Sequence, residues 1–123
     1  MTRLETCRRV EEEGLVPIIR APSPELALRA AEAIAAGGIS IVEITMTVPD
    51  AGSVIRALRA RCGDRVVIGA GTVLDAETVR ACVAAGADFI VSPGFDAATV
   101  TAAHFCGVPA MTGALTPTEV ITA

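Results

Sequence analysis

The sequence contains no lysine, no tryptophan and no tyrosine, and it has a single histidine. Its ten basic residues are all arginines, and fourteen acidic residues bring the formal net charge to −4. Nucleic-acid-binding domains carry basic clusters or aromatic stacking platforms, and the chain has neither. One histidine cannot complete a catalytic triad or, with widely spaced cysteines, a zinc site. We therefore expect no nucleic-acid partner, no metal ion and no other cofactor.

Long hydrophobic runs are also missing. Arg, Asp, Glu, Gly or Pro interrupts every apolar stretch well before the ~18 residues that a membrane helix requires. The charged segment at residues 1–14 has neither the apolar centre nor the cleavage site of a secretory signal. The four cysteines form no CxxC pair, which indicates reduced thiols. These features predict a cytoplasmic protein without a membrane segment, and a hydrophobic content of 52% excludes disorder.

What the sequence does contain is a repeat. Glycine recurs every 21 to 25 residues, each time before a short apolar run: Gly14, Gly38, Gly63, Gly86 and Gly107. A unit of this length fits one helix and one strand. Because the runs are apolar on both faces, they predict buried parallel strands. The five predicted strands are residues 15–20, 39–45, 65–72, 87–92 and 108–113.

Alanine-rich segments with helical spacing separate these strands. The predicted helices are residues 24–37, 51–63, 76–86 and 96–107, with another at the amino terminus and a last one that begins at TPTEVITA. Ser23 before Pro24, and Thr116 before Pro117, are helix start signals. The expected order is therefore α-(βα)₄-β-α, without a linker or domain boundary.

Two architectures fit alternating βα units: an open doubly wound sheet and part of a closed (β/α)₈ barrel. A five-stranded open sheet suits 123 residues better, because a full barrel usually takes ~200 or more. Against the open sheet, the first βα turn lacks a phosphate-binding glycine loop, and a proper closing helix is absent. Both architectures remain open on these grounds.

Glu43 is the residue that most strongly indicates chemistry. It lies in the middle of the apolar run ISIVEIT, where burial of an unpaired carboxylate costs several kcal/mol. Such burial raises a carboxyl pKa toward the range useful for proton transfer. The alternative is a carboxylate that reaches solvent or pairs with Arg20. Alternation places Glu43 on one strand face with Ile41 and Thr45.

Other candidates end neighbouring strands. Arg20 ends the first predicted strand, where both architectures place ligand groups, and arginine favours planar anions such as carboxylate. Thr72 lies in GAGTVL at the exit of the third strand and offers a hydroxyl beside two glycines. His104 lies late in a helix, at the wrong end of its unit for catalysis, so we expect a packing or surface role.

Taken in order, the motifs LVPIIRA, GGISIVEITMTVPDA, VVIGAGTVL, DFIVSPG and TGALTPTE resemble one family. They are similar to the amino-terminal half of 2-keto-3-deoxy-6-phosphogluconate (KDPG) aldolase, which also acts on 4-hydroxy-2-oxoglutarate (KHG). The resemblance implies a homotrimer and a partial (β/α)₈ TIM barrel, with residues 1–123 the amino-terminal part of a single domain. It also implies class I cleavage of KDPG to pyruvate and glyceraldehyde 3-phosphate, or of KHG to pyruvate and glyoxylate.

The same resemblance assigns roles to individual residues. Glu43 matches the general acid/base that moves protons during imine formation and carbon–carbon cleavage. Thr72 matches a residue that binds the pyruvyl carboxylate, and Pro93 lines that pocket. Arg20 matches an arginine that contacts the substrate acid group in part of the family. Thr47 occupies a substrate-binding position where some members have an arginine.

One departure concerns the nucleophile. Catalysis in the family depends on a lysine that attacks the substrate ketone to form a protonated imine. That lysine belongs on a sixth strand, and the sequence contains no lysine. We therefore expect a truncated chain that is inactive by itself, whose open sheet edges invite pairing with another copy. An inactive half-barrel that binds small anions, or another phosphosugar barrel such as an epimerase, is the alternative.

Overall fold

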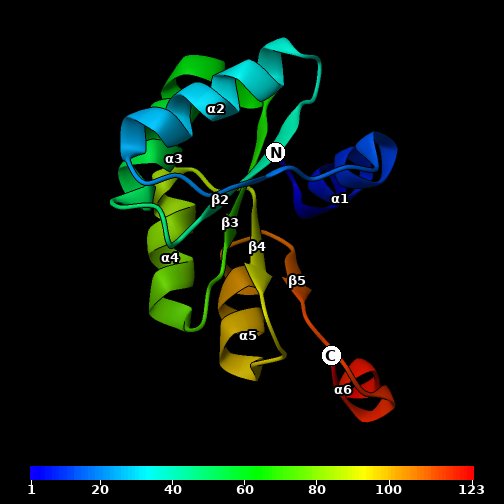
Figure 1. Cartoon of the computed structure of the whole chain (residues 1–123). Helices are drawn as coiled ribbons and strands as arrows, with labels where there is room; N and C mark the ends of the chain where they lie inside the picture. Colours follow the sequence, from blue (N-terminus) through cyan, green and yellow to red (C-terminus); the bar gives the residue numbers. More distant parts are fainter.

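The five apolar runs form one parallel sheet in a computed structural model that describes all 123 residues (Figure 1). The strands are β1 Ile18–Ile19, β2 Ile41–Thr45, β3 Val67–Gly71, β4 Phe89–Ser92 and β5 Ala110–Thr112. Their order in the sheet is β1-β2-β3-β4-β5, so every strand pairs with its neighbours in the sequence. A barrel wall has this order, whereas a doubly wound sheet reverses at a switch point. The open-sheet alternative is therefore wrong, and the partial barrel is confirmed.

Helices separate the strands in the predicted order. They are α1 Arg3–Glu13, α2 Pro24–Ala36, α3 Ala51–Cys62, α4 Ala76–Ala85, α5 Ala97–Phe105 and α6 Pro117–Thr122, with a short 3₁₀ turn at Gly63–Arg65. The predicted capping residues begin their helices: the Ser23 and Thr116 hydroxyl groups accept hydrogen bonds from the Leu26 and Glu119 amides. None of the six helices has both the length and the apolar character needed to cross a membrane.

The main core lies between the outer face of the sheet and the helices. Helices α2, α3, α4 and α5 pack against one another in sequence, and Figure 1 shows α2, α3 and α4 along one side of the sheet. Alternate strand residues such as Val42, Ile44, Ile68 and Ile90 are fully buried in this layer. Because the side-chain period of a strand is two, the residues between them face the inner side of the barrel wall.

Apolar side chains fill the amino-terminal end of the inner face. Ile41, Val67 and Phe89 form a small cluster there, and Val10 of α1 packs against it. Helix α1 is fixed by polar contacts as well: the Glu13 carboxylate accepts hydrogen bonds from the Ser40 amide and hydroxyl, at 3.2 and 2.7 Å. With this end covered by α1, the carboxyl-terminal half of the inner face is left for a site.

Both edges of the sheet are open, because β1 pairs only with β2 and β5 only with β4. Figure 1 shows α6 standing apart from the body of the molecule, beyond β5. This helix has no buried residue, and Leu115 just before it is 97% exposed. Helix α6 is therefore held by its own capping interactions and not by the core.

Candidate active site

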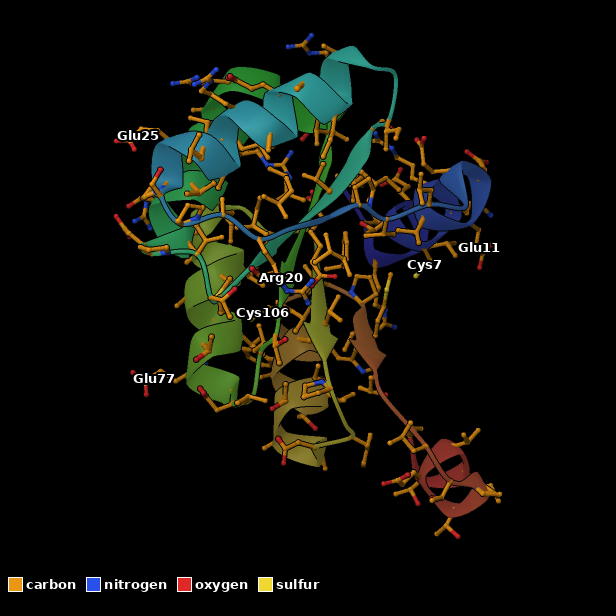
Figure 2. The ribbon with its side chains drawn as sticks, viewed as in Figure 1. Cys7, Glu11, Arg20, Glu25, Glu77 and Cys106 are labelled. Carbon is orange, nitrogen blue, oxygen red and sulfur yellow. The ribbon has the colours of Figure 1, made fainter.

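The predicted site residues lie along one edge of the sheet. Arg20 follows β1, Thr47 follows β2, Thr72 follows β3 and Pro93 follows β4, while Glu43 lies within β2. The carboxyl ends of parallel strands meet at one edge, which is the catalytic face of barrel enzymes. Figure 2 shows Arg20 beside the sheet, whereas Glu25 and Glu77 point outward from α2 and α4.

Glu43 is buried on the inner face of β2, with 6% of its surface exposed. Its neighbours in register are Ile18 of β1 and Gly69 of β3, neither of which offers a polar side chain. No hydrogen bond or ion pair engages the carboxylate; the three ion pairs of the chain involve Arg59 and Arg61. Pairing with Arg20, one of the alternatives raised by the sequence, is thus not formed.

The environment of Glu43 favours its neutral form. Burial raises the pKa of this carboxyl group, and the positive charge of Arg20 offsets only part of that effect. No fully buried side-chain oxygen in the chain lacks a partner, so the unpartnered Glu43 oxygens retain contact with the open side of the sheet. A carboxyl group that is desolvated, unpaired and still reachable is suited to exchange protons with a ligand.

A pair of threonines joins the ends of β1 and β2. The buried Thr45 hydroxyl donates to the Ile19 carbonyl oxygen at 2.9 Å, and its oxygen lies 2.8 Å from the Thr47 hydroxyl oxygen. Because Thr45 has one hydroxyl proton, Thr47 is the donor in the second contact. The exposed Thr47 therefore presents acceptor lone pairs to the site. Thr45 was not among the predicted site residues. Its place on the same strand face as Ile41 and Glu43 indicates that it faces the site, but not which atoms it contacts.

Thr72 and Pro93 are exposed on adjacent strand exits. The amide of Val73 donates to the Val91 carbonyl oxygen at 2.9 Å, which fixes the turn that carries Thr72. Pro93 lines a hollow of about 220 Å³ together with Ser92, Phe95 and others, and Thr72 is not among the lining residues. The structure thus brings both residues to the same edge without joining them in that hollow.

Residues that could hold a metal ion do not cluster. The structure has no group of three or more His, Cys, Asp or Glu side chains arranged as metal ligands. All four cysteines are free thiols, and His104 is exposed on α5, which is the surface position expected for it. The chemistry available at this edge therefore comes from a carboxyl group, a guanidinium and hydroxyl groups.

Comparison with known proteins identifies a family. The family model described as KDPG and KHG aldolase matches residues 7–123. The 2-dehydro-3-deoxy-phosphogluconate aldolase of Treponema pallidum is 38% identical over 111 residues, which cover 90% of this chain and 52% of the relative. The chain thus spans about half the length of the curated relatives it matches.

Solved structures also resemble this chain. The KDPG aldolase of Legionella pneumophila, solved with pyruvate captured at low pH as a covalent carbinolamine intermediate, is 34% identical with a TM-score of 0.80. That match covers 87% of this chain and 52% of the Legionella chain. A cube-shaped protein cage designed by fusing symmetric oligomeric domains also matches, at 34% identity and a TM-score of 0.81, over 87% of this chain and 40% of the cage chain.

Proposed function

The chain belongs to the KDPG and KHG aldolase family, and we propose that it forms the proton-transfer and carboxylate-binding half of a class I aldolase site. Residues 1–123 are then the amino-terminal part of a single barrel domain. The reaction is cleavage of KDPG to pyruvate and glyceraldehyde 3-phosphate, or of KHG to pyruvate and glyoxylate. The family match supports this reaction over that of the epimerase that the sequence left open.

Glu43 is the general acid/base in this proposal, and its burial without a partner is the observation that carries it. An imine on the substrate ketone accepts the electron pair of the breaking carbon–carbon bond. The Glu43 carboxylate takes the proton from the hydroxyl group on the leaving carbon, which departs as an aldehyde. The same group then returns a proton to the enamine carbon, and pyruvate forms when the imine is hydrolysed.

Arg20 and Thr72 bind the carboxylate of the keto acid in this proposal. Arginine matches a planar carboxylate with two parallel N–H donors, and the exposed Arg20 lies on the same strand face as Ile18 and Glu43. Thr72 adds a hydroxyl donor, and Pro93 shapes the adjacent surface. Thr47 presents an acceptor, so it receives a hydrogen bond from a substrate hydroxyl group or a water molecule and does not bind the carboxylate.

The nucleophile is the part that these residues do not supply. A class I aldolase forms its imine on a lysine, and the 123 residues include none. We propose that this chain alone binds keto acids and does not turn them over. We further propose that the protein is cytoplasmic and forms a homotrimer. The match between this chain and the chain of a cage built from symmetric oligomeric domains supports an oligomer.

Titration of the isotope-labelled chain with pyruvate, followed by NMR, tests the proposal. Signals of Arg20, Glu43 and Thr72 are expected to shift together, and borohydride treatment is expected to leave no reduced pyruvyl adduct on a side chain. Arg20→Gln is expected to weaken binding about tenfold or more, equivalent to about 1.4 kcal/mol. Arg29→Gln, a change of an exposed arginine on α2, is the matched control. Shifts confined to other regions, or equal affinities for both variants, would overturn the proposal.

A further inference from the structure

The inner face of β3 carries glycine at two alternate positions, Gly69 and Gly71, and each leaves space for a larger neighbour. A Cβ atom at Gly69 would overlap the ring of Phe89 from β4. A Cβ atom at Gly71 would overlap the Oε1 atom of Glu43 from β2, and it would lie 3.1 Å from the Glu43 Cδ atom. The second glycine therefore faces the candidate catalytic carboxyl group itself.

Backbone conformation does not explain glycine at either position. The glycines with positive φ are Gly14, Gly38, Gly63, Gly86 and Gly107, all of them outside the strands. Gly71 is the last residue of β3, pairs in register with Thr45 and does not have a positive φ. Its φ therefore does not call for glycine, and the observation at position 71 is the close approach of the Glu43 side chain.

We propose that Gly71 is a positioning residue for Glu43. The absence of a side chain at position 71 leaves a space, called the seat below, that the Glu43 carboxyl group occupies. A methyl group there would find the Val91 Cβ atom at 3.0 Å on its other side, so it could not simply lean toward β4. The carboxyl group would have to move instead. The relevance of this seat to catalysis rests on the proposed aldolase function, whereas the seat itself is a property of the chain.

Two directions are open to a displaced carboxyl group. One leads away from β3 toward β1 and the guanidinium of Arg20, whose charge lowers the pKa of Glu43. The other leads outward, toward solvent at the carboxyl end of the sheet. The remaining neighbours, Ile18, Gly69 and Val91, carry no charge. Both directions favour the ionised form, so displacement is expected to lower the pKa of Glu43.

NMR titration of the Glu43 side-chain carboxyl carbon in the full 123-residue chain tests the seat without any substrate. Gly71→Ala is expected to lower the Glu43 pKa by roughly one unit. Gly94→Ala is the matched control, because a Cβ atom at Gly94 meets nothing within 4 Å and its backbone φ is not positive. The control is expected to titrate like the original chain. An unchanged Glu43 pKa in Gly71→Ala would overturn the proposal.

A double-mutant cycle keeps the proposal testable if Gly71→Ala unfolds the chain. In denaturant unfolding, Gly71→Ala is expected to lower the midpoint more when Glu43 is present than in a Glu43→Ala background. A folded Glu43→Ala/Gly71→Ala chain beside an unfolded Gly71→Ala chain has the same meaning. Equal losses in both backgrounds would overturn the proposal and assign the obstacle to Val91.

The outcomes also separate this inference from the aldolase assignment. If Gly71→Ala shifts the Glu43 pKa while pyruvate leaves the Glu43 signals unmoved, the seat stands and the proposed function fails. If pyruvate shifts Glu43 and Gly71→Ala leaves its pKa unchanged, the function stands and the seat is wrong.

Discussion

Among single residues, Glu43 opposes the stability of the fold that holds it. Burial raises its pKa above the ordinary 4.5, so the folded chain binds the proton more tightly than the unfolded chain does. This contribution to stability is fully present below the unfolded pKa and is lost as the pH rises through the folded pKa. A group kept in an unfavourable environment at neutral pH is characteristic of a functional site.

Replacement of the carboxyl group by an amide of the same shape removes that conflict. We predict that Glu43→Gln raises the free energy of unfolding at pH 7 by about 1 kcal/mol. The gain should shrink as the pH falls below the folded pKa of Glu43, because the original side chain is then also neutral. Urea unfolding at a series of pH values measures it, and superimposable curves for the two proteins would count against a desolvated carboxyl group.

Arg59 has the opposite role, since it stabilises the amino-terminal end of the sheet. Its half-buried guanidinium pairs with Asp88, which also accepts a hydrogen bond from the Ile68 amide at 2.8 Å. The guanidinium further donates to three backbone carbonyl oxygens, those of Gly63, Val66 and Gly86. One side chain thus links α3 to the loops that precede β3 and β4.

We predict that Arg59→Met lowers the free energy of unfolding by roughly 2–3 kcal/mol, because Asp88 is left half-buried without its partner. Arg61→Met is the control. The pair of Arg61 with Glu32 is more exposed, at 57% and 38% for the two side chains, so its loss should change the free energy by less than about 1 kcal/mol. Chemical denaturation of both variants measures these changes, and similar losses of unfolding free energy would refute the role given to Arg59.

The site residues differ in how far the sequence reveals them. Glu43 could be predicted because a carboxylate within an apolar run stands out in the sequence itself, without knowledge of its neighbours in space. The roles of Thr45 and Gly71 could not, since they depend on which atoms of β1 and β2 lie opposite them. Contacts between strands are fixed by register, and no local pattern in the sequence states the register.

At the scale of elements, the helices after β3 and β4 begin with aspartate caps. Asp75 and Asp96 accept hydrogen bonds from the amides and hydroxyl groups of Thr78 and Thr99, and these bonds lower the pKa of both carboxyl groups below the ordinary 3.8. A lowered pKa contributes stability above the unfolded pKa, which is lost as the pH falls through the folded pKa. The sign is opposite to that of Glu43.

We predict that acid melts α4 and α5 from their first turns, and that Asp75→Asn with Asp96→Asn makes this loss less dependent on pH. Asparagine also caps helices, so the helix content at pH 7 should change little. Circular dichroism at 222 nm between pH 2 and pH 6 measures the effect. An unchanged acid transition in the double variant would show that other carboxyl groups control it.

The order of elements could be read from local sequence patterns, whereas their arrangement was indicated only by the resemblance to a known family. Glycine spacing and capping residues predicted all five strands and six helices, with ends that differ by a few residues because apolar runs continue into the loops. The choice between a barrel wall and an open sheet depends on which strands are neighbours. Both architectures use the same βα units, so local patterns do not separate them. The resemblance predicted the barrel, and the observed strand order confirms it.

For the whole molecule, the open edges of the sheet are the dominant feature. An edge strand with free N–H and C=O groups is a template for pairing with another chain. Ile18 in the edge strand β1 is 50% exposed, on the inner face beside Glu43. β1 lies in the segment between α1 and α2 and pairs only with β2, so its other side has no strand partner.

We predict that the chain self-associates at micromolar concentrations and that Ile18→Lys reduces the association. Leu74→Lys is the control, because Leu74 is 67% exposed and follows β3, the central strand of the sheet. Sedimentation velocity over a range of concentrations measures both. A monodisperse monomer at every concentration, or equal effects of the two substitutions, would contradict edge pairing.

The most direct measurement of the central claim, that Glu43 is the acid/base of an aldolase site, is pyruvate release from KDPG. The chain would be joined to the carboxyl-terminal half of the Treponema pallidum relative, and trapping by borohydride would test whether a lysine of that half reacts. We predict that this fusion cleaves KDPG and that Glu43→Gln lowers kcat about 100-fold or more. Equal rates with and without Glu43→Gln, or trapping without cleavage, would contradict the account.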